Sequence, residues 1–215
     1  MTVKGAIFDV DGTLLDSMEI WDTIGSDYLI SLGIKPREDL AKTLNSMSLQ
    51  EAAIYYRTEY GVGLTVDEIA DGVNKMIEDK YRYEVQCKDG AEDFLKKLSE
   101  NGVKMCIATA TDEYLVKAAL ERIGILKYFP QIFTCTDAGS GKTSPVIYEK
   151  ALEFLGTDKC NTLVLEDALY AAETAKKAGF TVAGIYDRHE ENQEKLKNIA
   201  DYYTDNMTDL CRILE

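Results

Sequence analysis

The order of apolar and polar positions divides the chain into three parts. A run of apolar residues at 5–8 is typical of a buried strand, because consecutive apolar side chains fit the interior of a parallel sheet. Residues 14–83 instead repeat apolar side chains at intervals of three and four, which predicts helices and no strand. From Cys87 onward, short apolar runs alternate with amphipathic stretches. This alternation predicts strands and helices that follow one another along a parallel sheet.

Signals for helix ends support about four helices in the segment 14–83. A first apolar stripe stops at Gly33, and glycine is common just after the last turn of a helix. A second, shorter helix is expected after Pro36, because proline is favoured at a helix start. Two capping boxes predict the starts of two more helices: Ser48 with Glu51, and Thr65 with Glu68.

The second half of the chain predicts a sheet with helices on its faces. Strands are expected at 103–109, 131–135, 162–165 and 181–185, and helices at 90–101, 113–123, 145–155, 168–178 and 191–199, before a final strand and helix. The predicted fold class is α/β, a doubly wound, mostly parallel, Rossmann-like sheet with an inserted α-helical segment. We expect residues 1–15 and 85–215 to form the α/β core domain, and residues 16–84 to form a four-helix cap domain.

Composition narrows the possible partners. The 24 basic and 38 acidic residues give a formal charge of −14, which argues against binding nucleic acid or an anionic membrane. The five cysteines are scattered and form no Cys-x-x-Cys pair, so we expect most of them to be small core residues rather than disulfide or zinc ligands. No apolar run approaches the roughly 18 residues of a membrane span. A monomer in the reducing cytoplasm is the expectation.

Two acids follow the first predicted strand directly. Asp9 and Asp11 precede Gly12, so both lie where a strand leaves its sheet at a turn. In open parallel sheets, ligands bind at this edge, and paired carboxylates suit a hard cation such as Mg²⁺. Asp9 can then attack an electrophile while Asp11 moves a proton. The alternative is a plain Asp-Gly turn, but a turn does not require Asp9 at the end of an apolar strand.

Two further segments have features suited to an anionic ligand. The strand that ends at Thr109 presents a hydroxyl and, with Ala110, successive backbone N–H groups that can hold a phosphate, although threonine at such a place more often caps a helix. Thr111 or Asp112 is the expected cap of the next helix. Lys142 lies in a glycine-rich loop, which is no nucleotide-binding P-loop, because Thr136 occupies the position of the first glycine.

A last acidic pair follows the strand at 162–165. Glu166 and Asp167 end this strand just as Asp9 and Asp11 end the first one. Carboxylates brought together at one sheet edge repel one another unless a cation neutralises them. The four acids therefore predict a divalent metal site.

These four segments, taken in order, resemble the haloacid dehalogenase superfamily. Its first motif is a hydrophobic strand followed by Asp-x-Asp-Gly-Thr, its second a Ser or Thr at a strand end, its third a loop lysine and its fourth an acidic pair. The resemblance implies that Asp9 is the nucleophile, that Asp11 is the general acid/base, and that Thr109, Ala110 and Lys142 hold the phosphate. It also implies Mg²⁺ bound by Asp9, Asp11 and Asp167, with Glu166 assisting. Lys142 is separated from Pro145 by two residues, and Ala168 and Ala171 replace the usual Ser and Gly.

The helical insert resembles that of the β-phosphoglucomutase-like branch. Asp11 argues against dehalogenases, which lack the second Asp, and the helix at 17–32 has no lysine of the kind that phosphonoacetaldehyde hydrolases use. Trp21 stands at the usual histidine position of the mutases and can line the pocket, and the segment 46–49 has no arginine to grip a second phosphate. A phosphatase for a small phosphorylated metabolite is favoured. A sugar phosphate mutase and a non-catalytic phosphate-binding relative remain as alternatives. His189 is expected at the surface.

Overall fold

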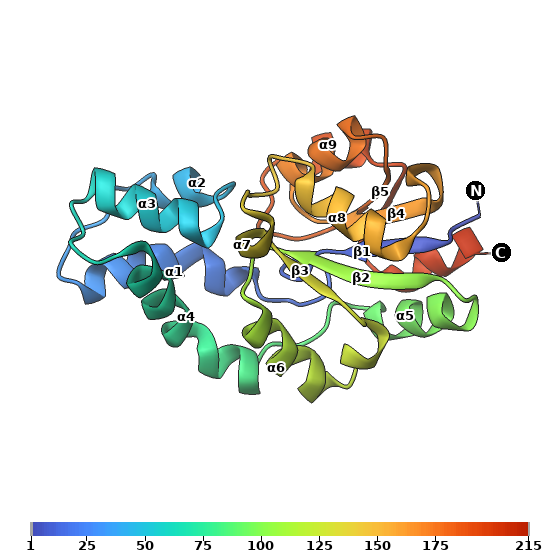
Figure 1. The fold of residues 1–215 in the computed structure, drawn as a ribbon, viewed down its shortest axis with the longest axis horizontal. Helices are drawn as coiled ribbons and strands as arrows, with labels where there is room; N and C mark the ends of the chain where they lie inside the picture. The colour runs from blue at the N-terminus through green and yellow to red at the C-terminus, as the bar shows by residue number, and fades with distance from the viewer. Residues whose placement is uncertain (1, 215) are drawn as a thin grey trace.

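A single six-stranded sheet forms the centre of the larger part of the molecule (Figure 1). The computed structural model describes residues 2–214. The strand order is β3-β2-β1-β4-β5-β6, and every neighbouring pair is parallel. The strands are β1 (Gly5–Phe8), β2 (Lys104–Thr109), β3 (Ile132–Thr134), β4 (Thr162–Glu166), β5 (Thr181–Ile185) and β6 (Tyr202–Thr204).

Helices cover both faces of the sheet, as expected for parallel strands. They are α5 (Ala91–Glu100), α6 (Glu113–Ile123), α7 (Cys135–Ala138), α8 (Val146–Leu155), α9 (Leu169–Lys177) and α10 (Gln193–Ile199), with 3-10 turns η1 (Leu126–Tyr128), η2 (Lys159–Asn161) and η3 (Met207–Leu214). In Figure 1, α8 and α9 lie above the sheet and α5 and α6 lie below it. The predicted α/β fold class is confirmed.

Strand β1 shows why this sheet requires cover on both sides. Phe8 belongs to the hydrophobic cluster shared with α5, where its ring lies 6.3 Å from that of Phe94. Ile7 belongs to a second cluster, with Ile147 of α8 and Ala172 of α9. Neighbouring side chains of a strand point to opposite faces, so an apolar residue at each position buries both of them.

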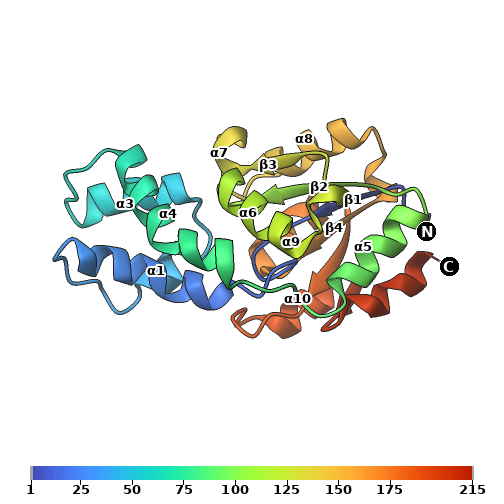
Figure 2. The ribbon, with the colours of Figure 1, turned by 90° about the horizontal axis from the view of Figure 1, so that it is seen from below.

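Four helices connect β1 to the rest of the sheet: α1 (Met18–Ser31), α2 (Leu40–Leu44), α3 (Leu49–Glu59) and α4 (Val66–Tyr83). They lie together beyond one end of the sheet, at the left of Figures 1 and 2. Both predicted capping boxes are formed, and Gly33 follows α1 with a positive φ. The Tyr56 hydroxyl donates to the Gly25 carbonyl oxygen across α3 and α1. The division into a core and a cap domain stays a prediction, and its end residues Met1 and Glu215 lie outside the described chain.

The two connections between α1–α4 and the sheet run side by side. The Asp16 N–H donates to the Gln86 carbonyl, and the Lys88 N–H donates to the Leu14 carbonyl, both at 2.9 Å. This short backbone pairing lies immediately after Asp11 in the chain. The position of the four helices is therefore coupled to the loop that carries the first acidic pair.

Several expectations about local structure were wrong. The strand at 131–135 ends one residue earlier, because Cys135 begins the short helix α7. The final helix is a 3-10 helix, and the helix after Pro36 begins only at Leu40. Of the cysteines, Cys106 and Cys135 are buried in the core, Cys87 and Cys211 are half-buried and pack against it, and Cys160 is exposed. Within residues 2–214, no helix has the length and apolar character required to cross a bilayer.

Candidate active site

The acidic pairs lie at the carboxyl ends of two adjacent strands. Phe8 of β1 is in register with Leu165 of β4, and the Asp9 N–H donates to the Leu165 carbonyl at 3.1 Å. The next residue of β4 is Glu166. Since β1 is the central strand between β2 and β4, residues from three motifs emerge at one edge of the sheet. The sequence predicted this edge, because parallel strands carry their ligands at their carboxyl ends.

Lys142 joins Asp9 and Glu166. Its ammonium forms an ion pair with Asp9 and another, at 2.8 Å, with Glu166 Oε1. The Tyr148 hydroxyl of α8 donates to the same Glu166 oxygen at 2.7 Å. All three charged residues are buried, at 8% exposure or less. A lysine this deeply buried is held by its two carboxylates, whereas a solvated loop lysine has no such partners.

Burial dominates the electrostatics of the cluster. It raises the pKa of the Glu166 carboxyl to about 8, against the opposing effect of Lys142. Burial also raises the pKa of Asp9 and, together with the neighbouring Asp9 and Glu166 charges, that of Asp167. Burial alone would lower the pKa of Lys142, but Asp9 and Glu166 raise it well above its usual value. The single ammonium group of Lys142 therefore does not neutralise the negative charge of all the carboxylates. A further positive charge would stabilise their ionised forms.

The acidic cluster has the composition of a hard cation site. Asp9, Glu166 and Asp167 each offer an oxygen atom, and these atoms lie within 4.8 Å of one another. The second Glu166 oxygen, Oε2, is buried without a hydrogen-bond partner. A buried, unpaired carboxylate oxygen is costly unless a ligand satisfies it. The residues present therefore fit Mg²⁺, which prefers carboxylate oxygens.

The turn after β1 contacts the fourth motif directly. The Thr13 hydroxyl donates to Asp167 Oδ1 at 3.0 Å. Gly12 has a φ of 79°, and a Cβ at this position would overlap the Asp167 carboxylate. The turn at Gly12 and Thr13 thus positions the Asp167 carboxylate. The Asp-Gly-Thr pattern alone does not reveal this role.

Asp11 accepts hydrogen bonds from three hydroxyl groups. Ser17 donates to Oδ1 at 2.5 Å, Thr111 donates to Oδ2 at 2.6 Å, and Tyr81 of α4 donates to Oδ1. The Trp21 indole N–H in turn donates to the Tyr81 hydroxyl at 2.8 Å. Asp11 is consequently oriented by groups from the connection before α1, from α4 and from the loop after β2.

Thr109 and Ala110 lie at the same sheet edge. Thr109 is fully buried, and its hydroxyl accepts the Thr111 N–H at 3.1 Å, whereas Ala110 and Thr111 line the pocket. The expected helix cap was wrong for Thr111, whose hydroxyl donates to Asp11. Asp112 occupies the N-cap position of α6 without a side-chain cap bond, and it accepts from Asn74 of α4 instead. The hydroxyl after a strand end was the available signal for Thr111, while Ser17 and Tyr81 carried none.

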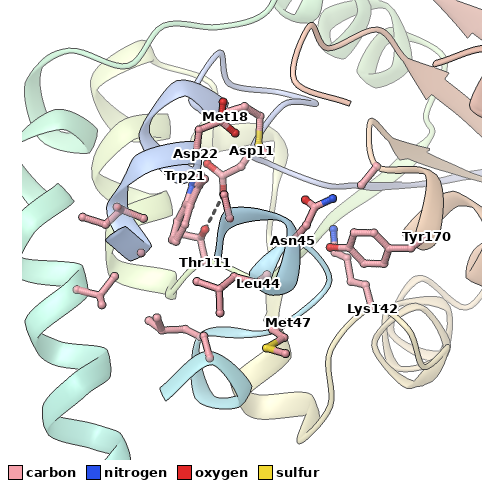
Figure 3. A pocket seen from close by; sticks show the side chains of 18 of the residues that line it. Asp11, Met18, Trp21, Asp22, Leu44, Asn45, Met47, Thr111, Lys142 and Tyr170 are labelled. Atoms are coloured by element: carbon pink, nitrogen blue, oxygen red, sulfur yellow. Dashed lines mark hydrogen bonds between the residues drawn. The ribbon is translucent and has the colours of Figure 1, made fainter. Parts of the chain in front are cut away.

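A pocket of about 170 Å³ opens between this edge and the four helices (Figure 3). Asp9, Asp11, Lys142, Glu166 and Asp167 line it on the sheet side. Trp21 and Leu49 line it on the helical side, so the expected position of Trp21 in the pocket is confirmed. His189, expected at the surface, is half-buried there: its side chain is 15% exposed and pairs with the exposed Asp22 of α1.

Comparison with known proteins gives concordant matches. The family profile of haloacid dehalogenase-like hydrolases matches residues 6–185. Validoxylamine A 7'-phosphate phosphatase of Streptomyces hygroscopicus subsp. limoneus is 25% identical over 191 residues, which is 87% of each chain. Hexitol phosphatase B of Escherichia coli K12 is 24% identical over 178 residues, covering 82% of this chain and 80% of the relative.

Two solved structures have the same fold along their whole length. CbbY of Rhodobacter sphaeroides, crystallised with phosphate, superposes with a TM-score of 0.81 at 25% identity and covers 97% of this chain and 96% of its own. A putative β-phosphoglucomutase of Thermotoga maritima gives 0.71 at 21% identity, with 99% and 98% covered.

Fold and site together define an α/β protein with a cluster of buried carboxylates at the carboxyl ends of its central strands β1 and β4. Because the profile spans most of the sequence, the chain belongs to the haloacid dehalogenase-like hydrolases, and the family predicted from the motifs is confirmed. The predicted enzyme class, a phosphoric monoester hydrolase, agrees with the named phosphatases among the relatives.

Proposed function

We propose that this protein is a Mg²⁺-dependent phosphatase that hydrolyses a small phosphomonoester through an aspartyl-phosphate on Asp9. The contact that carries the proposal is the buried Asp9–Lys142 ion pair at the pocket floor, next to Asp11. It provides a carboxylate nucleophile and a cation for the phosphoryl oxygens in one place. The names of the relatives, which act on validoxylamine phosphate and on hexitol phosphates, support a phosphorylated metabolite as substrate.

The first chemical step forms a bond between an Asp9 oxygen and phosphorus as the bond from phosphorus to the alcohol oxygen breaks. Asp11 gives its proton to the departing alcohol, since an alkoxide is a poor leaving group. Lys142, together with the backbone N–H of Ala110, holds the phosphoryl oxygens. Thr109, which the resemblance placed among the phosphate ligands, is fully buried and outside the pocket lining, so we assign it to the turn, where its hydroxyl accepts the Thr111 N–H.

The second step returns the enzyme to its starting state. Asp11 takes a proton from a water molecule, whose oxygen attacks phosphorus and displaces the Asp9 carboxylate as inorganic phosphate forms. The hydroxyls of Ser17, Tyr81 and Thr111 keep Asp11 pointed at the reacting oxygen in both steps.

The proposed metal would be held by Asp9, Asp167 and the Asp11 backbone carbonyl, with Glu166 assisting. Mg²⁺ supplies the positive charge that allows these carboxylates and a phosphate dianion to share one site. The unpaired Glu166 Oε2 and the proximity of the three carboxylates support this assignment.

A sugar phosphate mutase is the second candidate, because a putative β-phosphoglucomutase has the same fold. A mutase must grip the distal phosphate of a bisphosphate, for which arginine is the natural residue. Here Leu49 and Trp21 line the pocket on the helical side. These apolar side chains favour transfer of the phosphoryl group to water.

The decisive measurement is release of inorganic phosphate from a panel of phosphorylated metabolites by the purified protein with Mg²⁺. We expect turnover of phosphomonoesters and no turnover in the Asp9→Asn variant. Conversion of β-glucose 1-phosphate to glucose 6-phosphate faster than phosphate release would assign the mutase reaction instead. Absence of both reactions across the panel would favour the non-catalytic relative.

A further inference from the structure

The wall of the pocket that lies opposite the acidic residues is largely apolar. Figure 3 shows Leu44 and Met47 pointing into the cavity from α2 and the segment after it. Helices α1, α3 and α4 contribute more aliphatic side chains to the same wall. The larger aliphatic side chains on this wall are Met18, Ile24, Leu44, Met47, Leu49 and Val73, and the Trp21 ring, Ala41 and Ala52 line it as well.

The polar groups on this wall are mostly occupied by other parts of the protein. The Trp21 N–H donates to Tyr81, and the Tyr56 hydroxyl donates to the Gly25 carbonyl. Asp22 is paired with His189. The exposed Asn45 adds one amide at the rim. A ligand rich in hydroxyl groups would lose its water here and recover few hydrogen bonds.

Positive charge is concentrated at the opposite end of the pocket. Among the described residues that line it, Lys142 is the one basic side chain, and it already contacts Asp9 and Glu166. The charged residue on the helical wall is Asp22. A second anionic group on the substrate would therefore meet apolar side chains and a carboxylate.

From this wall, and resting on the proposed phosphatase function, we infer the substrate class: a monophosphate ester whose alcohol has an apolar body and carries no second anionic group. The whole pocket measures about 170 Å³ and the phosphate takes part of it, so the body is at most about one six-membered ring, because an apolar cavity of about 150 Å³ holds a benzene molecule. Burial of that body against the six aliphatic side chains supplies binding energy, and the phosphate remains with Lys142.

Cyclohexylmethyl phosphate and glucose 6-phosphate form a matched pair for the test. Both are primary esters on a six-membered ring, and they differ chiefly in the ring hydroxyls. We expect kcat/KM to be at least about tenfold higher for the apolar ester, since each buried, unpaired hydroxyl opposes binding. Fructose 1,6-bisphosphate should be poorer still. Equal values, or a preference for glucose 6-phosphate, the bisphosphate or the cationic ester phosphocholine, would overturn the inference.

Variants at the helical wall test its charge. Leu49→Arg and Met47→Arg each place a cation on the wall, so both should raise kcat/KM for the bisphosphate relative to the apolar ester. Ile54→Arg is the matched control, because Ile54 lies on α3 with 51% of its surface exposed and outside the pocket lining. Thermal melting of each variant reports whether it folds. Two folded wall variants with unchanged selectivity would contradict the inference.

Two further measurements separate the substrate class from the phosphatase function. Acetyl phosphate is too small to use the apolar wall, so its hydrolysis reports the acidic site alone. If acetyl phosphate is hydrolysed but the predicted selectivity is absent, only the substrate class is overturned. If neither acetyl phosphate nor any ester is hydrolysed, the phosphatase function is overturned. Calorimetric binding of the non-hydrolysable phosphonate analogues of the matched pair compares the two bodies without turnover. Tighter binding of the cyclohexyl analogue is expected, and equal binding would count against the inference.

Discussion

Asp9 is the residue on which the proposed chemistry depends most. Asp9→Asn preserves the side-chain volume but removes the negative charge and the nucleophilic oxygen. We expect kcat to fall by several orders of magnitude, as is usual when a covalent nucleophile is lost. Phosphate release by the folded variant is the measurement, and Asp27→Asn on the exposed surface of α1 is the control. Activity near that of the wild type would exclude Asp9 as the nucleophile.

Tyr81 acts through Asp11 in the proposed mechanism, so it is a positioning residue. Tyr81→Phe removes the hydroxyl between the Trp21 indole and the Asp11 carboxylate but keeps the buried ring. For alkyl phosphates, we expect a fall in kcat of about tenfold or more with little change in KM, because the proton donor is less well aligned.

The leaving group distinguishes positioning from general damage to the fold. p-Nitrophenyl phosphate needs little protonation of its leaving group, so Tyr81→Phe should slow its hydrolysis much less. Tyr83→Phe changes an exposed ring, 70% accessible, near the end of the same helix and should affect neither substrate. Equal losses for both substrates would mean that Tyr81 only supports the structure.

At the scale of elements, the turn between β1 and α1 holds the first and fourth motifs together. Gly12→Ala forces a side chain into the positive-φ region and against the Asp167 carboxylate. Gly61→Ala is a matched control, because Gly61 also has a positive φ but a Cβ there meets nothing within 4 Å. Both variants should lose about 1–2 kcal/mol of stability from backbone strain.

Activity separates the two glycine variants. Only Gly12→Ala should also lose most phosphatase activity and bind Mg²⁺ more weakly, since it displaces a proposed metal ligand. Chemical denaturation measures the free energy of unfolding, and phosphate release as a function of Mg²⁺ concentration measures the site. Equal activity of the two variants would show that the contact between Gly12 and Asp167 is dispensable.

At the scale of the whole molecule, we expect the buried carboxylates to couple the proposed metal binding to stability. The pKa of Glu166 is raised by burial from 4.5 to about 8. Between these values the unfolded chain has lost this proton while the folded chain retains it, so the free energy of unfolding of the metal-free protein falls as pH rises. Below pH 4.5 both states are protonated and the effect of Glu166 on the pH dependence vanishes.

Mg²⁺ should oppose this loss, because it binds the ionised carboxylates of the folded state. We expect Mg²⁺ to raise the melting temperature more at pH 8 than at pH 5.5, with chelator abolishing the difference. Ca²⁺ should stabilise the fold but support little turnover, because its looser coordination misplaces Asp9. Full activity in the presence of chelator would contradict the proposed metal site. A melting temperature that Mg²⁺ does not change at either pH would contradict it as well.

The sequence by itself determined the elements and the sheet edge. The predicted helix 113–123 and strand 181–185 agree with the structure residue for residue. The signals that predict such elements are the spacing of apolar residues, the capping residues and the glycine after a helix, and all of them depend on neighbouring residues alone. The positions of Asp9 and Glu166 near one edge also followed from local signals, since strand ends in a parallel sheet converge. Lys142 lies in the loop between α7 and α8, and only the family resemblance predicted its place at the site. The catalytic roles of all three residues stay predictions.

The tertiary structure alone decided which distant side chains serve Asp11 and which face the substrate. Tyr81 is 70 residues from Asp11, and Thr111 is 100 residues away, so no local period relates them. His189 pairs with Asp22 for the same reason, because packing between α1 and a loop after β5 brings them together. Local patterns specify which face of each element is apolar, whereas the packing of those faces determines which polar side chains meet.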